Sequence, residues 1–428
     1  MAAGRSVART VGLVAVGWLA SAAPVRAARS ELAKDVEAYL RAPAAAEGPL
    51  LDALSTASCR SLAEAIEAVP PLSPLRTVKR HDLTFESRGA TWTYSLRLPS
   101  GYQPNRRYPV LALPDHASVD ARDGLDFWAS DPAFDGVILF RPVITRHQDD
   151  RTRFPDPQFF AVHQAMAEVM RDGLAHLRLQ YAVDPDRVTM TGLSQAGFLT
   201  WFYAVTFPDD LAAIVPESAG GTAVVGGCLP LVENVAGLTV RILHAKGDKV
   251  CPYADALAMH DAALAAGARA TLVTYDDADW KTVVPPSRHP GPHDLRRRHV
   301  ADVVKTARRT VPTSFRRRLR YAVQGIEGRF RVPPPAKVAD AFTVTCAAND
   351  GRLTADRPGV VYLASVGDVV LPKTYRLSNG LEATTEGVPL RIGTRSVFPT
   401  EDPRLLLRTL KRTGDRGRLV AAEVPLDP

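Results

Sequence analysis

The sequence predicts an α/β protein with a doubly wound, mainly parallel sheet, a short N-terminal helical segment and a small C-terminal all-β domain. Short apolar runs alternate with helical patterns of about 12 residues or more between residues 78 and 310. This order is typical of parallel strands joined by crossover helices that cover both faces of a sheet. Two helical patterns precede this region, and a Pro-rich stretch follows it near residue 330. A chain of 428 residues is long enough for two or three domains.

Residues 1–27 have the layout of a secretory signal peptide. Arg5 and Arg9 precede a short apolar run, no acidic residue lies before that run, and small residues at 22–27 suit cleavage. The run is short for a membrane span of about 20 residues, and an uncleaved anchor is the alternative. No later segment is apolar enough to span a membrane. We therefore expect a secreted or periplasmic protein without stable membrane insertion after cleavage.

Residues 28–77 are expected to form the helical segment. Apolar residues at three- and four-residue spacing predict helices over 30–42 and 50–69, with a stop at Pro70 and Pro71.

The central domain is expected over residues 78–328. It opens with three strand patterns, and the turn signal PSGYQPN separates the second from the third. All strand patterns of this domain lie at 83–87, 91–98, 108–114, 136–142, 187–191, 212–218, 239–245 and 268–275. The helical patterns between and after them lie at 159–181, 195–207, 254–267 and 295–309.

Residues 329–428 read as a small β-sandwich-like domain behind the stiff linker RVPPPAK. Asn-Asp-Gly and Asn-Gly turns separate short strand-like runs at 341–348, 359–365, 369–380 and 418–426.

The stretch VTMTGLSQAGF at 188–198 predicts a nucleophile elbow. Ser194 lies between an apolar strand and an apolar helix, the context that supports the pattern G-x-S-x-G. Ala196 replaces the second glycine of that pattern, and Gly197 beside it preserves the close approach of strand and helix. Ser194 is therefore the expected nucleophile, and the alternative is a Gly-Ser turn without chemistry.

A serine nucleophile needs a histidine base and an acid that orients the base. Asp248 follows the strand at 239–245 in a Gly-Asp turn, 54 residues after Ser194 (248 − 194), and is the expected acid. The alternative for Asp248 is a purely structural role, as a turn residue or a helix cap. Asp255 is the fallback acid, although its place in the next helix favours a cap.

Three histidines follow the last strand of the central domain. His299 is expected well inside the final helix, far from the edge of the sheet. His289 lies in the preceding loop and is the favoured base. His293 follows Pro292 and is the alternative, either as the base or as a cap of the helix.

The runs YAVDPDRVTMTGLSQAGF, TFPDDLAAIVPESAG and ILHAKGDKV resemble the α/β-hydrolase superfamily. The closest resemblance is to exported bacterial carboxylesterase/phospholipase-like and prolyl-oligopeptidase-like serine hydrolases. It covers roughly residues 78–310, and the flanking segments resemble the multidomain members. By position the resemblance implies Ser194 as nucleophile, Asp248 as acid and His289 as base.

The resemblance also implies an oxyanion hole, with one departure. Such enzymes usually carry His-Gly after the third strand, whereas this chain has Asp115 and His116 there and no glycine. The backbone N–H of Gln195 gives one donor, and the second is expected from around His116 or Ala117. Loss of one donor costs about 3 kcal/mol of transition-state stabilisation. An anionic Asp115 aimed at the oxyanion would weaken catalysis further.

The sequence thus predicts a serine hydrolase that cleaves carboxylic esters through an acyl-enzyme, with a small-molecule ester or peptide as substrate. One alternative is a peptidase of prolyl-oligopeptidase type. The other is a catalytically weak or inactive binding protein that keeps the hydrolase fold, which the altered oxyanion region favours. Core packing is the expected role of Trp128, Trp201 and Trp280, and lining of the substrate pocket is the alternative for each.

No metal or nucleotide cofactor is expected. The sequence has no Cys-x-x-Cys, His-Glu-x-x-His, G-x-G-x-x-G or P-loop pattern, and His289 and His293 flank Pro-Gly-Pro, so they cannot share a helix face.

The net charge of +7 is concentrated between Arg296 and Arg320, without aromatic interleaving. We expect a solvated helix face there and no nucleic acid, an anionic partner being the alternative. Cys228 and Cys251 could form a disulfide or remain buried thiols.

Overall fold

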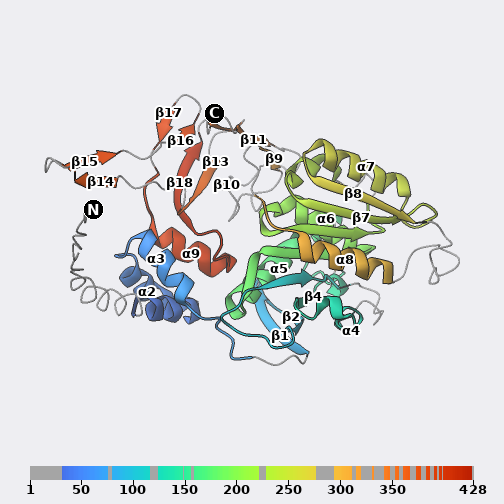
Figure 1. The fold of residues 1–428 in the computed structure, drawn as a ribbon, viewed down its shortest axis with the longest axis horizontal. Coiled ribbons are helices and arrows are strands. Elements are labelled where there is room, and N and C mark those ends of the chain that lie inside the picture. The colour runs from blue at the N-terminus through green and yellow to red at the C-terminus, as the bar shows by residue number, and fades with distance from the viewer. Residues whose placement is uncertain are drawn as a thin grey trace, which may run out of the picture.

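An eight-stranded sheet forms the centre of the protein, with helices on both faces (Figure 1). The computed structural model describes residues 31–75, 80–115, 124–147, 149–155, 159–220, 228–275, 294–310, 315–319, 330–331, 342–347, 352–355, 360–366, 373–376, 382–385, 390–392, 395–397 and 399–426. The expected signal peptide at 1–27 lies outside these residues.

The strands of the sheet follow the order β1-β2-β4-β3-β5-β6-β7-β8. Pairing is antiparallel from β1 to β2 and from β2 to β4, and parallel across the other six strands. Their bounds are β1 His81–Ser87, β2 Ala90–Arg97, β3 Tyr108–Ala112, β4 Ile138–Val143, β5 Val183–Leu193, β6 Ala213–Glu217, β7 Thr239–Ala245 and β8 Arg269–Tyr275. The predicted fold class, a mainly parallel sheet wound on both faces, is confirmed.

Two helical layers cover the sheet. Helices α4 (Leu125–Ala129) and α8 (Asp294–Thr306) pack on one face, and α5 (Phe159–Gln180), α6 (Gln195–Thr206) and α7 (Tyr253–Ala265) pack on the other. Strand β3 shows why both faces are apolar: Val110 and Ala112 enter the core under α5 and α6, whereas Leu111 and Leu113 enter the core under α4 and α8. Such continuous apolar runs are characteristic of strands buried on both faces.

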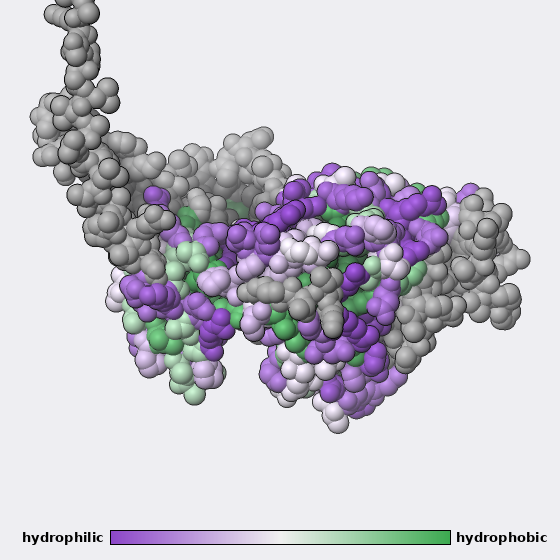
Figure 2. Space-filling view, turned by 60° about the horizontal axis from the view of Figure 1, so that its bottom comes forward, coloured by the Kyte–Doolittle hydropathy of each residue, from purple (hydrophilic) through white to green (hydrophobic). Residues whose placement is uncertain are grey.

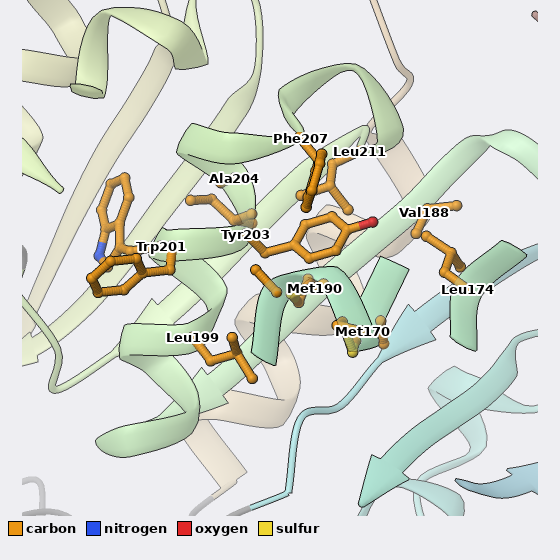
Figure 3. Close-up of a cluster of buried hydrophobic side chains, with 14 of the residues drawn as sticks. Met170, Leu174, Val188, Met190, Leu199, Trp201, Tyr203, Ala204, Phe207 and Leu211 are labelled. Carbon is orange, nitrogen blue, oxygen red and sulfur yellow. The ribbon is translucent and has the colours of Figure 1, made fainter. Parts of the chain in front are cut away.

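Helix α6 is buried almost all round because it lies between the sheet and its neighbours. Every residue from Leu199 to Thr206 is buried, and Figure 3 shows Trp201 and Tyr203 of α6 in one apolar cluster with Met190 of β5 and Met170 of α5. Trp201 is therefore a core residue, as is Trp128, and both are fully buried. The alternative that they line a substrate pocket is wrong, and Trp280 lies outside the described residues.

The N-terminal helices pack against the C-terminal part of the chain. Residues 31–41 are helical, followed by α2 (Glu47–Leu54) and α3 (Cys59–Ala68). The single helix expected over 50–69 is thus two helices, because the Ser58 hydroxyl caps α3 by accepting from the Ser61 amide. Apolar side chains of this segment share a core with α9 (Pro403–Thr413) and β18 (Val420–Leu426).

The C-terminal strands form three small sheets. Their orders are β10-β13-β18, β17-β16-β12-β11-β9 and the pair β14-β15. Strand β9 precedes the boundary expected at residue 329 and nevertheless pairs with β11, and helix α9 was not among the expected elements. The bounds are β9 Phe315–Leu319, β10 Phe330–Arg331, β11 Phe342–Ala347, β12 Arg352–Ala355, β13 Val360–Ser365, β14 Lys373–Arg376, β15 Glu382–Thr385, β16 Leu390–Ile392 and β17 Arg395–Val397.

Short 3-10 helices complete the described secondary structure. They are η1 (Ala44–Ala46), η3 (Pro132–Phe134), η4 (Thr145–His147), η5 (Pro208–Asp210) and η7 (Leu229–Val235).

Buried ion pairs join the central domain to the C-terminal part. Arg309, just after α8, lies 2.5 Å from Asp415, which follows α9, and the Asp415 side chain is fully buried. Arg317 of β9 lies 2.9 Å from Asp209. Arg296 is buried completely. The expectation of a solvated basic face is therefore wrong for Arg296, Arg309 and Arg317, because each has an acidic partner from another element.

The surface gives no sign of a membrane span within the described chain. On the face shown in Figure 2 the described surface is mostly hydrophilic, and hydrophobic residues form smaller groups. None of the described helices combines the length and the apolar character that crossing a bilayer requires.

Cys228 and Cys251 are both buried free thiols, so the disulfide alternative is wrong and the thiol alternative is confirmed.

Candidate active site

Ser194 occupies a strained turn between β5 and α6. Its backbone angles are φ 53° and ψ −119°, a conformation that glycine adopts easily and other residues rarely do. The Ser194 amide donates to the carbonyl of Glu217 over 2.9 Å, so the turn is tied to the end of the neighbouring strand β6. The side chain remains half-buried. Strain of this kind persists only where the surrounding structure enforces it, and it is concentrated at functional sites.

The elbow requires small residues on both sides of Ser194. A Cβ atom on Gly192 would lie 2.3 Å from the backbone C and O of Ala196. A Cβ on Gly197 would lie 2.7 Å from Ala219 Cβ and 2.9 Å from the Glu217 carbonyl oxygen. Ala196 itself is fully buried. Gly197 thus takes the close approach that the second glycine of G-x-S-x-G normally takes, and the expectation for this departure is confirmed.

The hydroxyl of Ser194 is not used to cap the helix that follows it. Serine at the residue before a helix usually accepts a bond from the first turn, but Ser194 makes no such side-chain bond. The first helical hydrogen bond runs from the Phe198 amide to the Ser194 carbonyl over 2.9 Å. Gln195 is the first residue of α6, so its amide lies at the positive end of the helix dipole, where negative charge is stabilised.

Asp248 is held rigidly in the turn after β7. Its Oδ1 accepts hydrogen bonds from the amides of Val250 (2.8 Å) and Cys251 (2.9 Å), and its side chain is fully buried. Oδ2 lies 3.8 Å from Nε2 of His244. Asp248 therefore does have the structural turn role given above as its alternative, and this role fixes the carboxylate in one orientation. Asp255 lies in the first turn of α7, but the N-cap of this helix is Pro252 and no side chain caps it, so the expected cap role of Asp255 is not seen.

His244 supports this turn and was not singled out in the sequence. It is fully buried at the end of β7, and its Nε2 donates to the carbonyl of Cys251 over 2.8 Å. Its ring packs edge-on against Tyr253, with centroids 6.1 Å apart. The signal available in the sequence was a histidine at the next-to-last position of a largely apolar strand pattern. His244 thus secures both ends of the Asp248 turn.

Ser194 and Asp248 lie at the same edge of the sheet. The ladder pairs Leu193 with Glu217 and Glu217 with Leu243, so β5, β6 and β7 end nearly level. Strand β8 ends at this edge as well, since its last residue, Tyr275, pairs with Ala245. Residues 276–293 follow Tyr275 in the sequence and lie outside the described residues. These undescribed residues include both proposed bases, His289 and His293. His299 lies within α8 as expected, and its backbone carbonyl accepts from Arg241.

Asp115 does not present a bare charge to the site. Its Oδ1 accepts from the amides of Ile144 and Thr145 at 2.7 Å each, and its Oδ2 lies 3.3 Å from both the amide N and Nε of Arg146. These donors follow β4, which lies on the side of β3 away from β5. The concern that Asp115 faces the oxyanion is thus removed. His116 and Ala117 lie outside the described residues.

A buried polar cluster lies at the end of β6, on the face of the sheet that α4 and α8 cover, and was missed in the sequence. The hydroxyl of Tyr275 donates to Oε1 of Glu217, and Nε of Arg296 lies 3.1 Å from Oε2 of Glu217. The guanidinium of Arg296 lies 4.9 Å from the ring centre of Trp128. Burial, and then the Glu217 charge, raise the pKa of Tyr275 well above its ordinary value, so the phenol stays protonated and donates. Nothing in the sequence indicates that Glu217, in a strand, and Arg296, in a helix, lie in contact.

No metal centre is evident among the residues that the structure describes, since they contain no group of three or more His, Cys, Asp or Glu side chains able to hold an ion.

No protein-family model and no curated protein sequence matches this chain. Solved structures resemble part of it. A thermostable esterase is 20% identical, with 54% of this chain aligned to 63% of that one and a TM-score of 0.43. An acylaminoacyl peptidase from Pyrococcus horikoshii is 13% identical over 56% of this chain and 43% of its own, with a TM-score of 0.43. Est1E from Butyrivibrio proteoclasticus is 15% identical over 52% of this chain and 96% of its own, with a TM-score of 0.36.

These three proteins belong to the α/β-hydrolase superfamily. The chain spans less than two thirds of the esterase and less than half of the peptidase. The strand order, the glycine-flanked elbow at Ser194 after β5 and the carboxylate of Asp248 after β7 are features of this chain itself. By these features the chain has the α/β-hydrolase fold that its sequence predicts.

Proposed function

We propose that this chain is a serine hydrolase that cleaves carboxylic esters. The observation that carries the proposal is the conformation of Ser194, with φ 53° and ψ −119° at the head of α6. A positive φ at a non-glycine residue costs free energy, and the hydroxyl it presents is not used for capping. Presentation of a nucleophile is a physical reason for keeping that geometry.

In the proposed reaction, Ser194 Oγ attacks the ester carbonyl carbon while the base takes the hydroxyl proton. The tetrahedral intermediate collapses, the base returns the proton to the leaving alcohol, and water then hydrolyses the acyl-enzyme by the same steps. The base is His289, with His293 as the alternative. Asp248, fixed through Oδ1 by two amides, would orient the imidazole through Oδ2.

The proposed oxyanion hole combines the Gln195 amide with a second donor from around His116 or Ala117. The Gln195 amide lies at the N-terminus of α6, where developing negative charge is favoured. Esters are intrinsically more reactive than amides, so a hole that departs from the usual His-Gly form is better suited to esters than to peptides.

The proposal is tested by labelling the folded protein with a fluorophosphonate and by following p-nitrophenyl butyrate hydrolysis. We expect one adduct on Ser194 and no hydrolysis by Ser194→Ala. His289→Ala and His293→Ala, measured side by side, identify the base as the variant with the larger loss of kcat. Absence of an adduct on Ser194 in folded protein would overturn the enzyme proposal in favour of a binding protein. Faster cleavage of peptide than ester substrates would favour the peptidase.

We also propose that the protein is exported and acts on a small ester outside the cytoplasm. This part rests on residues 1–27 of the sequence. Mass spectrometry of the protein recovered from a bacterial expression host tests it: removal of about 27 residues in the extracytoplasmic fraction is expected, and an intact N-terminus in the cytoplasm would contradict it.

A further inference from the structure

A cavity of about 390 Å³ lies where four parts of the chain meet. Its walls come from the end of α3 and the residues after it, the stretch before β3, the residues that join α5 to β5, and the turn after α9. Strand β5 begins at Val183 in the cavity wall and ends at Leu193, next to Ser194. At about 3.3 Å per residue, the strand places the cavity roughly 30 Å from Ser194. The cavity is therefore separate from the candidate active site, and its volume is in the range of small-molecule sites.

The walls of this cavity are held in place by the fold itself. The amides of Leu72 and Ser73 donate to the carbonyls of Leu179 (3.1 Å) and Gln180 (3.0 Å), so the chain after α3 is tied to the end of α5. Proline rings, which restrict the backbone, line the cavity at Pro70, Pro71, Pro104 and Pro185. A preformed cavity of this kind avoids the ordering cost of binding a ligand.

Arg416 brings a positive charge to the cavity wall. Its guanidinium donates to three backbone carbonyls at the end of α3, those of Ile66, Val69 and Pro70. Among the residues that the structure describes, no carboxylate forms an ion pair with Arg416. Burial lowers the pKa of Arg416 below its ordinary value, as expected for a charge that nearby carboxylates do not fully offset. A guanidinium has five N–H donors, so the Nε–H and one Nη2–H remain for a ligand.

Arg178 is the second guanidinium of the wall. It is buried, and its Nη1 lies 3.6 Å from Oδ1 of Asp210, but Asp210 also pairs with Arg171 and Arg418. Nε of Arg178 is buried and has no hydrogen-bond partner within the described part of the chain. A shared carboxylate and an unsatisfied donor leave the charge of Arg178 only partly offset.

The charges of the lining residues identify the kind of ligand that fits. The third guanidinium, that of Arg107, pairs with Glu67 at the half-exposed rim. With Asp210 behind Arg178, one positive charge, that of Arg416, has no paired carboxylate. A carboxylate ligand supplies one negative charge, whereas a phosphate monoester carries about −1.5 to −2 at pH 7. Apolar wall residues, among them Val69 and Ala182, favour a ligand that also has an apolar part.

We propose that this cavity binds a small carboxylic acid in its ionised form, whose carboxylate pairs with Arg416 and whose apolar part lies against the proline-lined wall. Two neighbouring guanidinium donors match the two oxygens of a carboxylate. The carbonyls at the end of α3 fix the guanidinium, so little side-chain freedom is lost on binding. This inference is independent of the proposed hydrolase activity.

Isothermal titration calorimetry of the full chain with hexanoate and benzoate tests the proposal. We expect at least one of the two acids to bind, and its amide, which keeps the shape without the charge, to bind about tenfold more weakly or less. Arg416→Gln should also weaken binding about tenfold or more. The matched control is Arg404→Gln, which removes the same charge from α9 outside the cavity, where Arg404 pairs with Asp52 over 2.6 Å. Its dissociation constant should stay within about twofold of wild type.

Ala68→Glu and Ala68→Gln form a second pair, which leaves Arg416 and its bonds to α3 intact. Ala68 is an exposed residue at the end of α3 and lines the cavity. The added carboxylate of Ala68→Glu should weaken binding of the acid about tenfold relative to Ala68→Gln, which has the same size without the charge. If Arg416→Gln does not fold, this pair decides.

Binding of neither acid at about 10 mM would overturn the proposal. So would binding that Arg416→Gln, or Ala68→Glu relative to Ala68→Gln, leaves unchanged, because the acid would then occupy another site. Tighter binding of inorganic phosphate or phenyl phosphate than of the two acids would also overturn it, in favour of a phosphate site.

Discussion

The Ser194 amide and the Glu217 carbonyl are joined by a hydrogen bond of 2.9 Å at the edge of the sheet. This bond holds a serine at φ 53° against its conformational preference. The neighbouring Ser218, the first residue after β6, also has a positive φ of 46°. Strain is thus concentrated at the ends of two adjacent strands, where the proposed nucleophile lies, and its cost can be measured by substitution.

Ser194→Gly should be more stable than Ser194→Ala by about 1 kcal/mol, although both should lose ester hydrolysis. Glycine adopts the conformation at φ 53° and ψ −119° without strain, whereas alanine keeps the strained Cβ and loses only the hydroxyl. Urea denaturation measures the difference, and fluorophosphonate labelling checks that neither variant reacts at this position. Equal stability of the two variants would show that the turn is not strained.

Gly192→Ala should destabilise the protein by about 3 kcal/mol or prevent folding, because its Cβ would meet the backbone of Ala196 at 2.3 Å. Backbone atoms at the start of a helix cannot give way as a flexible side chain can. The matched control is Ala196→Gly, which restores the common pattern at a buried helical position. It should cost only about 1 kcal/mol and keep activity. A Gly192→Ala protein as stable as wild type would contradict the close packing of the elbow.

The sheet domain was largely predictable because its strands and helices carry strong hydrophobic patterns. Strand β7 has the predicted bounds, 239–245, and α5 ends one residue before the prediction. The places of Ser194 after β5 and Asp248 after β7 follow from chain order, because each residue comes directly after a strongly apolar strand pattern. Periodicity cannot show which residues pair across elements. The pairing of β9 with β11 was therefore not foreseen. The helix over 50–69 was predicted unbroken because apolar spacing does not show the local Ser58 cap that divides it.

The polar interior could not be predicted for the same reason. Arg296 and Arg309 look like surface residues in a basic run, yet each is buried against an acid that is distant in sequence, Glu217 and Asp415 respectively. Asp115 was expected near the oxyanion because it follows β3, but the amides after β4 capture its carboxylate. Tertiary contacts decide the environment of a charge, and one sequence does not contain them.

Asp415→Asn should destabilise the protein by about 3–5 kcal/mol, because it removes the only fully buried carboxylate among the described partners of the Arg309 guanidinium. The control is Asp186→Asn. Asp186 binds the same guanidinium at 2.8 Å, but 55% of its side chain is exposed, so the cost should be about 1 kcal/mol or less. Similar losses from the two variants would contradict the buried location of the Arg309–Asp415 pair.

The same pair predicts how stability depends on pH. Burial alone would raise the pKa of Asp415, but Arg309, with Arg178 and Arg418, outweighs it and holds the pKa well below its ordinary value. A carboxyl whose pKa is depressed in the folded state stabilises the fold above its unfolded pKa of about 3.9, and this contribution is lost as the pH falls below that value. The free energy of unfolding should therefore fall less steeply between about pH 4 and pH 2 in Asp415→Asn than in wild type. Parallel curves would show that Asp415 is not responsible.

Three cysteine thiols should be unreactive in the native protein. Cys59, Cys228 and Cys251 are buried. Burial, together with the nearby charges of Asp248 and Asp255, raises the pKa of the Cys251 thiol to about 12. Burial also raises the pKa of Cys59 to about 12 and that of Cys228 above its ordinary value. The reactive thiolate is therefore scarce at pH 8. In a Cys346→Ser background, Ellman's reagent should detect no thiol in folded protein and three after unfolding without reductant. Only one thiol after unfolding would instead reveal a disulfide.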